Sequence, residues 1–196
     1  LSLRYNQIEA ALSRADIKRL LKATHVIAEL RQRTHLVRFY TSILEDPAFK
    51  IRIMHHDCKM SNILLDATTK KAIGPIDLDT VMPGYYFSDI GDLIRSMAGT
   101  VDENSTRWGA IDIREDFYEA IINGYLDGIG DTFTDSERLN IHWAGMFMIY
   151  MQCLRFVTDF LNNDIYYITN YPEQNLNRAL NQLLLLERLE EFLEER

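Results

Sequence analysis

Apolar residues recur at helical spacing along most of this 196-residue chain, and no other feature of the sequence constrains the fold as strongly. The clearest run lies over residues 135–162, where large apolar side chains fall three or four positions apart. Similar spacing marks residues 3–44, 111–126 and 173–195. This periodicity predicts amphipathic helices that each bury one face, so we expect a mainly helical domain.

Local signals indicate some of the helix boundaries. We expect the first helical region to contain two helices separated by a break at residues 31–34, and a short helix over residues 89–98. The helix over residues 135–162 has Thr134 or Asp135 as its N-cap, because such side chains accept a hydrogen bond from the first helical turn.

Residues 51–84 do not follow the helical pattern. Two short apolar runs, residues 63–65 and 72–76, flank a polar turn at residues 66–71. Runs of this length on either side of a turn predict two antiparallel strands. The fold class that we expect is therefore mainly α, with one small β-hairpin.

Composition excludes several classes of protein. A formal net charge of −8 argues against a nucleic-acid-binding protein, which usually has a basic surface. No run of eighteen apolar residues is present, so we expect no membrane-spanning helix. The two cysteines, Cys58 and Cys153, lie far apart and form no disulfide framework, which indicates a reducing compartment and a cytoplasmic protein.

Acidic and amide side chains are concentrated at the two ends of the predicted hairpin. Asp57 and Asn62 precede its first strand, and Asp77 and Asp79 end its second strand. Residues two apart on a strand point to the same side, so the hairpin is expected to gather three carboxylates and one amide. Carboxylate and amide oxygens are suitable ligands for Mg²⁺.

Phosphoryl transfer from a nucleotide requires this set of groups. The spacing D-x-x-x-x-N, followed by a strand and a second Asp, is the catalytic arrangement of protein kinases. It assigns Asp57 as the base, Asn62 and Asp77 as metal ligands, and Asp79 as a further ligand, direct or through water. A lone D-x-x-x-x-N arises often by chance and an Asp in a hairpin usually caps a turn, so the interpretation rests on the combined pattern.

Residues 55–66 (HHDCKMSNILLD) and 76–79 (IDLD) resemble the aminoglycoside phosphotransferase and choline kinase superfamily. Further along the chain, residues 76–95 and 154–186 are similar to N-acetylhexosamine 1-kinases. The resemblance implies the C-lobe of a protein-kinase-like fold, with ATP and Mg²⁺ as cofactors. It also implies phosphorylation of a small-molecule acceptor, namely the anomeric hydroxyl of an N-acetylhexosamine.

The resemblance also implies an organisation of the chain. Residues 1–196 correspond to one lobe, with the catalytic loop and metal hairpin at 51–84 and the helical, substrate-binding part at 1–50 and 85–196. The glycine-rich loop and strand lysine of a complete kinase are not found here, which places a nucleotide lobe upstream of Leu1. We therefore expect the isolated chain to be inactive or very weakly active, and to self-associate through the apolar face left exposed.

Individual positions take roles from the same resemblance. Asp89 is expected to hydrogen-bond the backbone of the catalytic loop, with a helix N-cap as the alternative, and His55 to support the loop. Arg155 is expected to bind the sugar, and the alternative is an ion pair with Asp159, in the less favourable order for a helix. His56 departs from the family, whose members commonly carry Asn or Gly there.

Other polar and aromatic residues near these positions have structural interpretations. Asp92 and Arg95 lie three apart on a predicted helix and are expected to form an ion pair. Tyr166 and Tyr167 are expected to pack in the core, although they and Arg178 lie in the stretch that resembles the sugar kinases.

Two alternatives to an amino-sugar kinase remain open from the sequence. The acceptor of the kinase is then choline, an aminoglycoside or another small alcohol. Alternatively, the chain is a non-catalytic, pseudokinase-like module that binds a ligand without transfer. The complete set of Asp57, Asn62 and Asp77 argues against the second alternative.

Overall fold

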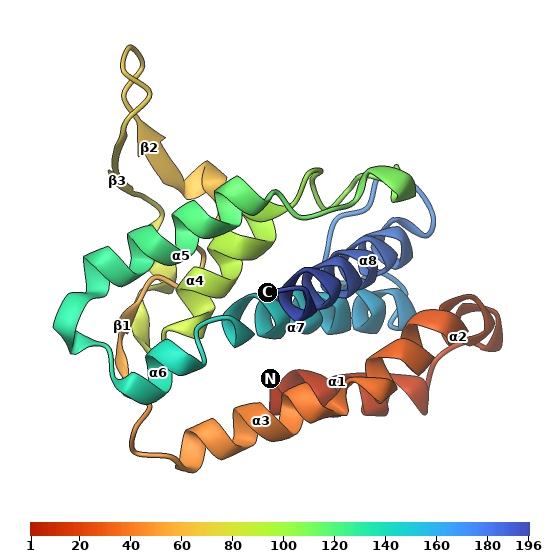
Figure 1. Ribbon diagram of the computed structural model, residues 1–196. Coiled ribbons are helices and arrows are strands. Elements are labelled where there is room, and N and C mark those ends of the chain that lie inside the picture. The colour runs from red at the N-terminus through yellow and green to blue at the C-terminus, as the bar shows by residue number, and fades with distance from the viewer.

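Helices make up most of the computed structural model, which describes residues 1–196, and two small antiparallel sheets lie at one end (Figure 1). The helices are α1 (Ser2–Leu12), α2 (Ile17–Gln32), α3 (Thr34–Glu45), α4 (Phe87–Leu93), α5 (Glu115–Ile129), α6 (Asp135–Leu139), α7 (Trp143–Leu161) and α8 (Gln174–Glu194). The strands are β1 (Arg52–Met54), β2 (Ile63–Leu65), β3 (Ala72–Pro75) and β4 (Met82–Gly84). The expectation of a mainly helical domain is confirmed.

The core of the molecule is built around α7. This helix packs against α8, α4, α1 and α2, and Figure 1 shows it between α8 and the N-terminal helices. Its residues Leu154, Phe156 and Val157 are completely buried. The hydroxyl of Tyr150 donates a hydrogen bond of 3.0 Å to the carbonyl oxygen of Leu30 on α2, which fixes the two helices together. Burial on nearly every side explains why α7 is so rich in apolar residues.

The N-terminal region contains three helices where two were expected. The predicted break at residues 31–34 is confirmed, because α2 ends at Gln32 and α3 begins at Thr34. A further break separates α1 from α2. There the carboxylate of Asp16 accepts a hydrogen bond of 2.8 Å from the backbone N–H of Lys18 and caps α2.

The predicted helix over residues 135–162 is also divided, into α6 and α7. Thr134 caps α6 as expected: its hydroxyl accepts from the Glu137 N–H, and the Glu137 side chain accepts from the Thr134 N–H. The first segment then ends at Asn140. The short helix over residues 89–98 is confirmed as α4, which continues into one π-helical turn over Ile94–Ala98.

The predicted hairpin is confirmed as β2 paired with β3, and it projects from the body of the molecule in Figure 1. A second sheet, β1 paired with β4, was not predicted. Its strands have only three residues each and lie far apart in the sequence, so no local pattern indicates that they pair. None of the helices combines the length and apolar character that crossing a lipid bilayer requires.

Candidate active site

The loop between β1 and β2 holds Asp57 and Asn62 against each other. The side-chain Nδ2 of Asn62 donates to the Asp57 backbone oxygen over 3.0 Å and to the Asp57 Oδ2 over 2.8 Å. Asn62 is buried, with 6% of its surface exposed, whereas Asp57 is partly exposed. Asp57 and Asn62, which are five positions apart in the sequence, are therefore in direct contact. Their hydrogen bonds use the Nδ2 of Asn62 and leave its Oδ1 without a partner.

His55 joins this loop to the segment that carries Asp77. The backbone N–H of Asp57 donates to the His55 Nδ1 over 3.3 Å. Because Nδ1 is an acceptor, the ring proton lies on Nε2, which donates to the Ile76 oxygen over 2.8 Å. His55 is buried at 8% exposure, so the two bonds fix the loop from inside.

Asp89 supports the same loop from α4. Its Oδ2 accepts from the His55 N–H over 2.9 Å and its Oδ1 from the His56 N–H over 2.8 Å. The alternative role as a helix N-cap is not observed, because α4 begins at Phe87. A carboxylate on a packed helix thus fixes two consecutive peptide groups next to Asp57.

Asp77 and Asp79 do not lie on a strand, which corrects the expected geometry. β3 ends at Pro75, Asp77 has a left-handed backbone (φ 64°, ψ 58°), and Asp79 lies in a 3₁₀ turn over Leu78–Thr80. Strand alternation therefore does not apply to them, and both are exposed. No three His, Cys, Asp or Glu side chains lie close enough together to hold a metal ion, so the predicted pocket of three carboxylates is wrong.

Asn62 and Asp77 nevertheless offer a pair of free oxygen donors. The Ile76 N–H donates to the Asn62 backbone oxygen over 2.8 Å, which brings the residue before Asp77 beside Asn62. The Asn62 Oδ1 and the Asp77 carboxylate make no hydrogen bond or ion pair within the chain. Mg²⁺ keeps several water ligands and commonly takes only one or two protein oxygens besides phosphates. The donor set therefore fits that ion.

Asp57 opens onto a cleft of about 550 Å³. The Lys59 Nζ lies 2.7 Å from the Asp57 Oδ2 in this cleft, so an ammonium group stands beside the candidate base. Their hydrogen bond raises the pKa of the Lys59 ammonium above its usual value, although burial opposes the shift. Lys59 was not predicted as a site residue, although it lies only two residues after Asp57 in the sequence.

A chain of partly buried ion pairs lines the cleft. The predicted pair of Asp92 and Arg95 is confirmed at 2.8 Å. Arg95 also binds Glu103 at 2.7 Å, and Glu103 binds Arg178. Burial raises the pKa of Asp92 above its usual value, although the positive charge of Arg95 acts to lower it. Glu103 was not predicted, because it reaches the cleft from a loop rather than from a patterned helix.

Several polar atoms that line the cleft have no partner. The buried Nε2 of His56, Nε of Arg178 and Oε1 of Gln182 make no hydrogen bond. Buried polar groups are normally paired, so these three atoms are exceptions among the residues that line the cleft.

Arg155 lines the cleft too and does not pair with Asp159. The Asp159 carboxylate accepts instead from the N–H groups of Tyr166 and Tyr167, each over 2.9 Å. The prediction of core packing holds for Tyr167, which packs against the core, and is wrong for Tyr166, which is 70% exposed.

His56 is the position where the sequence departs from the kinases that it resembles. Its backbone is left-handed, with φ of 66°, a conformation that glycine and asparagine adopt more readily than most residues. Its ring packs directly against Gly84 on β4, where a Cβ would overlap the ring. The departure therefore places an aromatic ring, with an unpaired nitrogen, at the edge of the cleft.

A model of the phosphotransferase enzyme family matches residues 4–137 of the chain, which is more than half of it. The matched residues include the loop at 55–62, Asp77 and Asp89. Arg155 and Arg178, which also line the cleft, lie beyond the matched segment.

Proposed function

Because this chain belongs to the phosphotransferase enzyme family, we propose that its cleft binds a small alcohol and orients one hydroxyl for phosphorylation by ATP. The observation that carries the proposal is the fixed carboxylate of Asp57 at the cleft. It is held by Asn62 and stands 2.7 Å from the Lys59 ammonium. A base that faces a cleft and has a cation beside it is the arrangement that phosphoryl transfer to an alcohol needs.

In this proposal Asp57 accepts the proton of the acceptor hydroxyl as its oxygen attacks the γ-phosphorus. The new O–P bond forms while the bond from the γ-phosphorus to the bridging oxygen of ADP breaks, and ADP leaves. Lys59 compensates negative charge on the transferred group. Asn62 and Asp77 would hold Mg²⁺, with Asp79 acting through water, and the ion supplies charge neutralisation at the nucleotide phosphates.

The charges of the cleft favour a neutral acceptor over a cationic one. Its lining has four acidic and four basic side chains. Three of the carboxylates already bind cations of the chain, in the pairs Asp57–Lys59, Asp92–Arg95 and Glu103–Arg178. Choline and aminoglycosides carry positive charge and would find few free carboxylates. A neutral sugar needs no free carboxylate, which supports an N-acetylhexosamine as the acceptor and Arg155, which lines the cleft, as one of its ligands.

A nucleotide-binding lobe is proposed to cover the two small sheets. Large apolar side chains are exposed on both sheets and on the turn between β3 and β4, including Ile53 and Ile73 at 68% each, Leu78 at 59% and Met82 at 51%. A patch of this kind marks a contact surface. We propose that the chain alone is inactive or very weakly active and self-associates through this face, which sedimentation velocity measures directly.

The test of the function is a transfer assay with the full open reading frame that contains this chain. The acceptors are N-acetylglucosamine, N-acetylgalactosamine, choline and kanamycin, each with ATP and Mg²⁺. Phosphorylation of an N-acetylhexosamine at its anomeric hydroxyl supports the whole proposal. Transfer to choline or kanamycin alone would contradict the assignment of the acceptor. Binding of an acceptor without any transfer would contradict catalysis and would indicate a non-catalytic binding module.

A further inference from the structure

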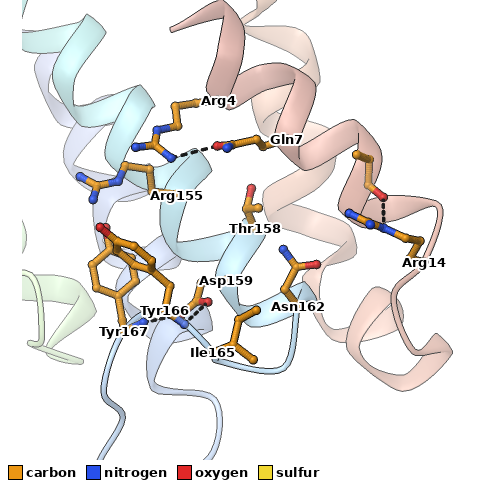
Figure 2. A pocket seen from close by; sticks show the side chains of 11 residues that line it. Arg4, Gln7, Arg14, Arg155, Thr158, Asp159, Asn162, Ile165, Tyr166 and Tyr167 are labelled. Atoms are coloured by element: carbon orange, nitrogen blue, oxygen red, sulfur yellow. Dashed lines mark hydrogen bonds between the residues drawn. The ribbon is translucent and has the colours of Figure 1, made fainter.

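A second cavity, of about 310 Å³, lies between α1, α7 and the loop after α7 (Figure 2). We call it the arginine pocket, because Arg4 of α1, Arg14 in the turn after α1 and Arg155 of α7 all line it. The catalytic residues Asp57 and Asn62 are not part of its wall. It is therefore a separate cavity from the cleft described above.

The three arginines have no carboxylate partner. Arg4 donates to the Gln7 Oε1 over 2.9 Å, Arg14 to the Ala10 oxygen over 3.2 Å, and Arg155 to the Gln152 Oε1 over 3.0 Å. All three of these acceptors are neutral. The chain as a whole has a formal net charge of −8. Three guanidinium groups without carboxylate partners therefore make this cavity a positively charged region of an acidic protein.

The single acidic residue of the arginine pocket, Asp159, does not neutralise this charge. Its two oxygens accept from the N–H groups of Tyr166 and Tyr167 and from the Nδ2 of Asn175, the last over 2.9 Å. These bonds turn the carboxylate toward the loop after α7, as Figure 2 shows for the two tyrosine N–H groups. The pocket therefore keeps a positive excess that a bound anion would compensate.

Two further features of the lining indicate the kind of ligand. Thr158 lines the pocket, and its Oγ1 is buried and has no hydrogen-bond partner within the chain. Tyr166, beside Arg155, is 70% exposed, and Ile165 next to it is 80% exposed. The wall thus combines cationic donors with an apolar and aromatic surface, which suits an anion attached to a small organic body.

We propose that the arginine pocket is a binding site for a small phosphomonoester, with the phosphate on the arginines and the organic part against Tyr166. Guanidinium groups bind phosphate oxygens through paired N–H donors, and a phosphate dianion matches several uncompensated cations better than a single carboxylate does.

The arginine pocket and the cleft share part of one wall. Arg155 and Tyr167 line both cavities. A phosphate that draws the Arg155 guanidinium into the arginine pocket removes it from the cleft. Where the cleft binds the acceptor as proposed above, a bound phosphomonoester lowers the affinity for that acceptor.

The test is a calorimetric titration of the protein with phenyl phosphate at constant ionic strength, without ATP or acceptor. Inorganic phosphate and benzoate serve as probes of the two halves of the ligand. The variants are Arg4→Gln and Arg14→Gln, and Arg38→Gln is the matched control. Arg38 is also an arginine without an ion pair, but it lies on α3 outside the pocket and donates only to the Thr34 hydroxyl.

The proposal expects saturable binding of one phenyl phosphate, weakened roughly tenfold or more by Arg4→Gln and by Arg14→Gln, since each removes a charge-assisted hydrogen bond. Arg38→Gln leaves the affinity unchanged, and inorganic phosphate binds more weakly than phenyl phosphate. Equal loss in all three variants, or no saturable binding, overturns the site. Benzoate binding as tightly as phenyl phosphate overturns the phosphomonoester assignment. Because neither ATP nor acceptor is present, these outcomes are independent of the proposed kinase activity.

Discussion

The side-chain amide of Asn62 donates a hydrogen bond of 2.8 Å to the carboxylate of Asp57. The two residues are five positions apart, and the intervening loop folds back through a 3₁₀ turn that ends at Asn62. The bond uses the nitrogen of the amide and leaves its oxygen free. One residue therefore orients the candidate base and keeps a potential metal ligand available at the same time.

The first prediction concerns the base. Asp57→Asn preserves the shape of the side chain and removes its ability to accept a proton, so we expect kcat to fall by about 10²- to 10⁴-fold. The fold should persist, because Asp57 is partly exposed and lies outside the hydrophobic core. Steady-state kinetics of the full reading frame measures the effect, and circular dichroism checks the fold.

A matched control for this variant is Asp46→Asn. The Asp46 carboxylate accepts only the Ala48 N–H, on the exposed surface, over 2.8 Å. Asp46→Asn should therefore keep kcat within about twofold of the wild-type value, since surface substitutions usually have small effects. Comparable rates for wild type and Asp57→Asn would show that another group accepts the proton.

The second prediction concerns the support from α4. Asp89→Asn replaces one accepting oxygen with a donor, so only one of the two bonds from the His55 and His56 N–H groups can remain. We expect faster amide hydrogen exchange at residues 55–57 and a lower kcat, with little change in the exchange of α7. Hydrogen exchange followed by mass spectrometry measures the first effect.

The control for Asp89 is Asp66→Asn in the β2–β3 turn. Asp66 also accepts two backbone N–H groups, those of Thr68 and Thr69, but in the exposed turn of the β2–β3 hairpin. Both of these bonds end on one oxygen, Oδ1, which an asparagine retains, so Asp66→Asn should leave the exchange at residues 55–57 unchanged. If Asp89→Asn leaves the exchange at residues 55–57 unaltered, Asp89 does not support the catalytic loop.

The third prediction is a pH dependence at Glu137. This residue has no exposed surface, and it accepts from Arg52 on β1 over 2.6 and 2.8 Å and from the Lys50 N–H over 2.8 Å. Burial alone would raise the pKa of Glu137, but the bonds from Arg52 and two backbone N–H groups outweigh it and lower the pKa from its usual 4.5. Glu137 therefore ties β1 to α6.

Glu137→Gln should lower the free energy of unfolding by about 3 kcal/mol at pH 7, because it leaves Arg52 without its charged partner. A lowered folded-state pKa contributes stability above the unfolded pKa, and this contribution is lost as the pH falls. The difference between wild type and Glu137→Gln should therefore shrink below about pH 4.5. Urea unfolding at several pH values measures it; a difference that is constant between pH 7 and pH 3 contradicts the explanation.

The fourth prediction tests the contact of His56 with Gly84. A Cβ at Gly84 would lie 2.7 Å from the His56 Nε2 and closer still to another ring atom, so Gly84→Ala must displace the ring. We expect a loss of about 1–3 kcal/mol in the free energy of unfolding, as for other overpacked sites. Combined with His56→Gly, the same change should cost less than about 0.5 kcal/mol. Additive effects in this double-mutant cycle would mean that the two residues are not in contact.

Local sequence patterns were sufficient for most helices and for the β2–β3 hairpin, because each depends on residues close together in the chain. They failed where a single capping residue divides a continuous apolar pattern, as at Asp16 and Asn140. They also failed for β1 and β4, whose pairing depends on residues some thirty positions apart, Arg52 with Gly84.

The candidate site shows the same division. The contact between Asp57 and Asn62 follows from their spacing, and the bonds made by Asp89 follow from the resemblance to a known family. The orientation of Asp77 does not follow, because its left-handed backbone breaks the strand alternation that the prediction assumed. The arginine pocket was beyond prediction, since it joins Arg4 to Arg155 through the packing of α1 against α7.

The most direct test of the central claim is a crystal structure of the full reading frame with Mg²⁺, a non-hydrolysable ATP analogue and N-acetylglucosamine. The account predicts the anomeric hydroxyl within hydrogen-bonding distance of the Asp57 carboxylate, about 2.6–3.2 Å. It also predicts Mg²⁺ on the Oδ1 of Asn62 and on Asp77. A sugar hydroxyl bound away from Asp57, or a nucleotide whose metal does not touch Asn62 and Asp77, would contradict the account.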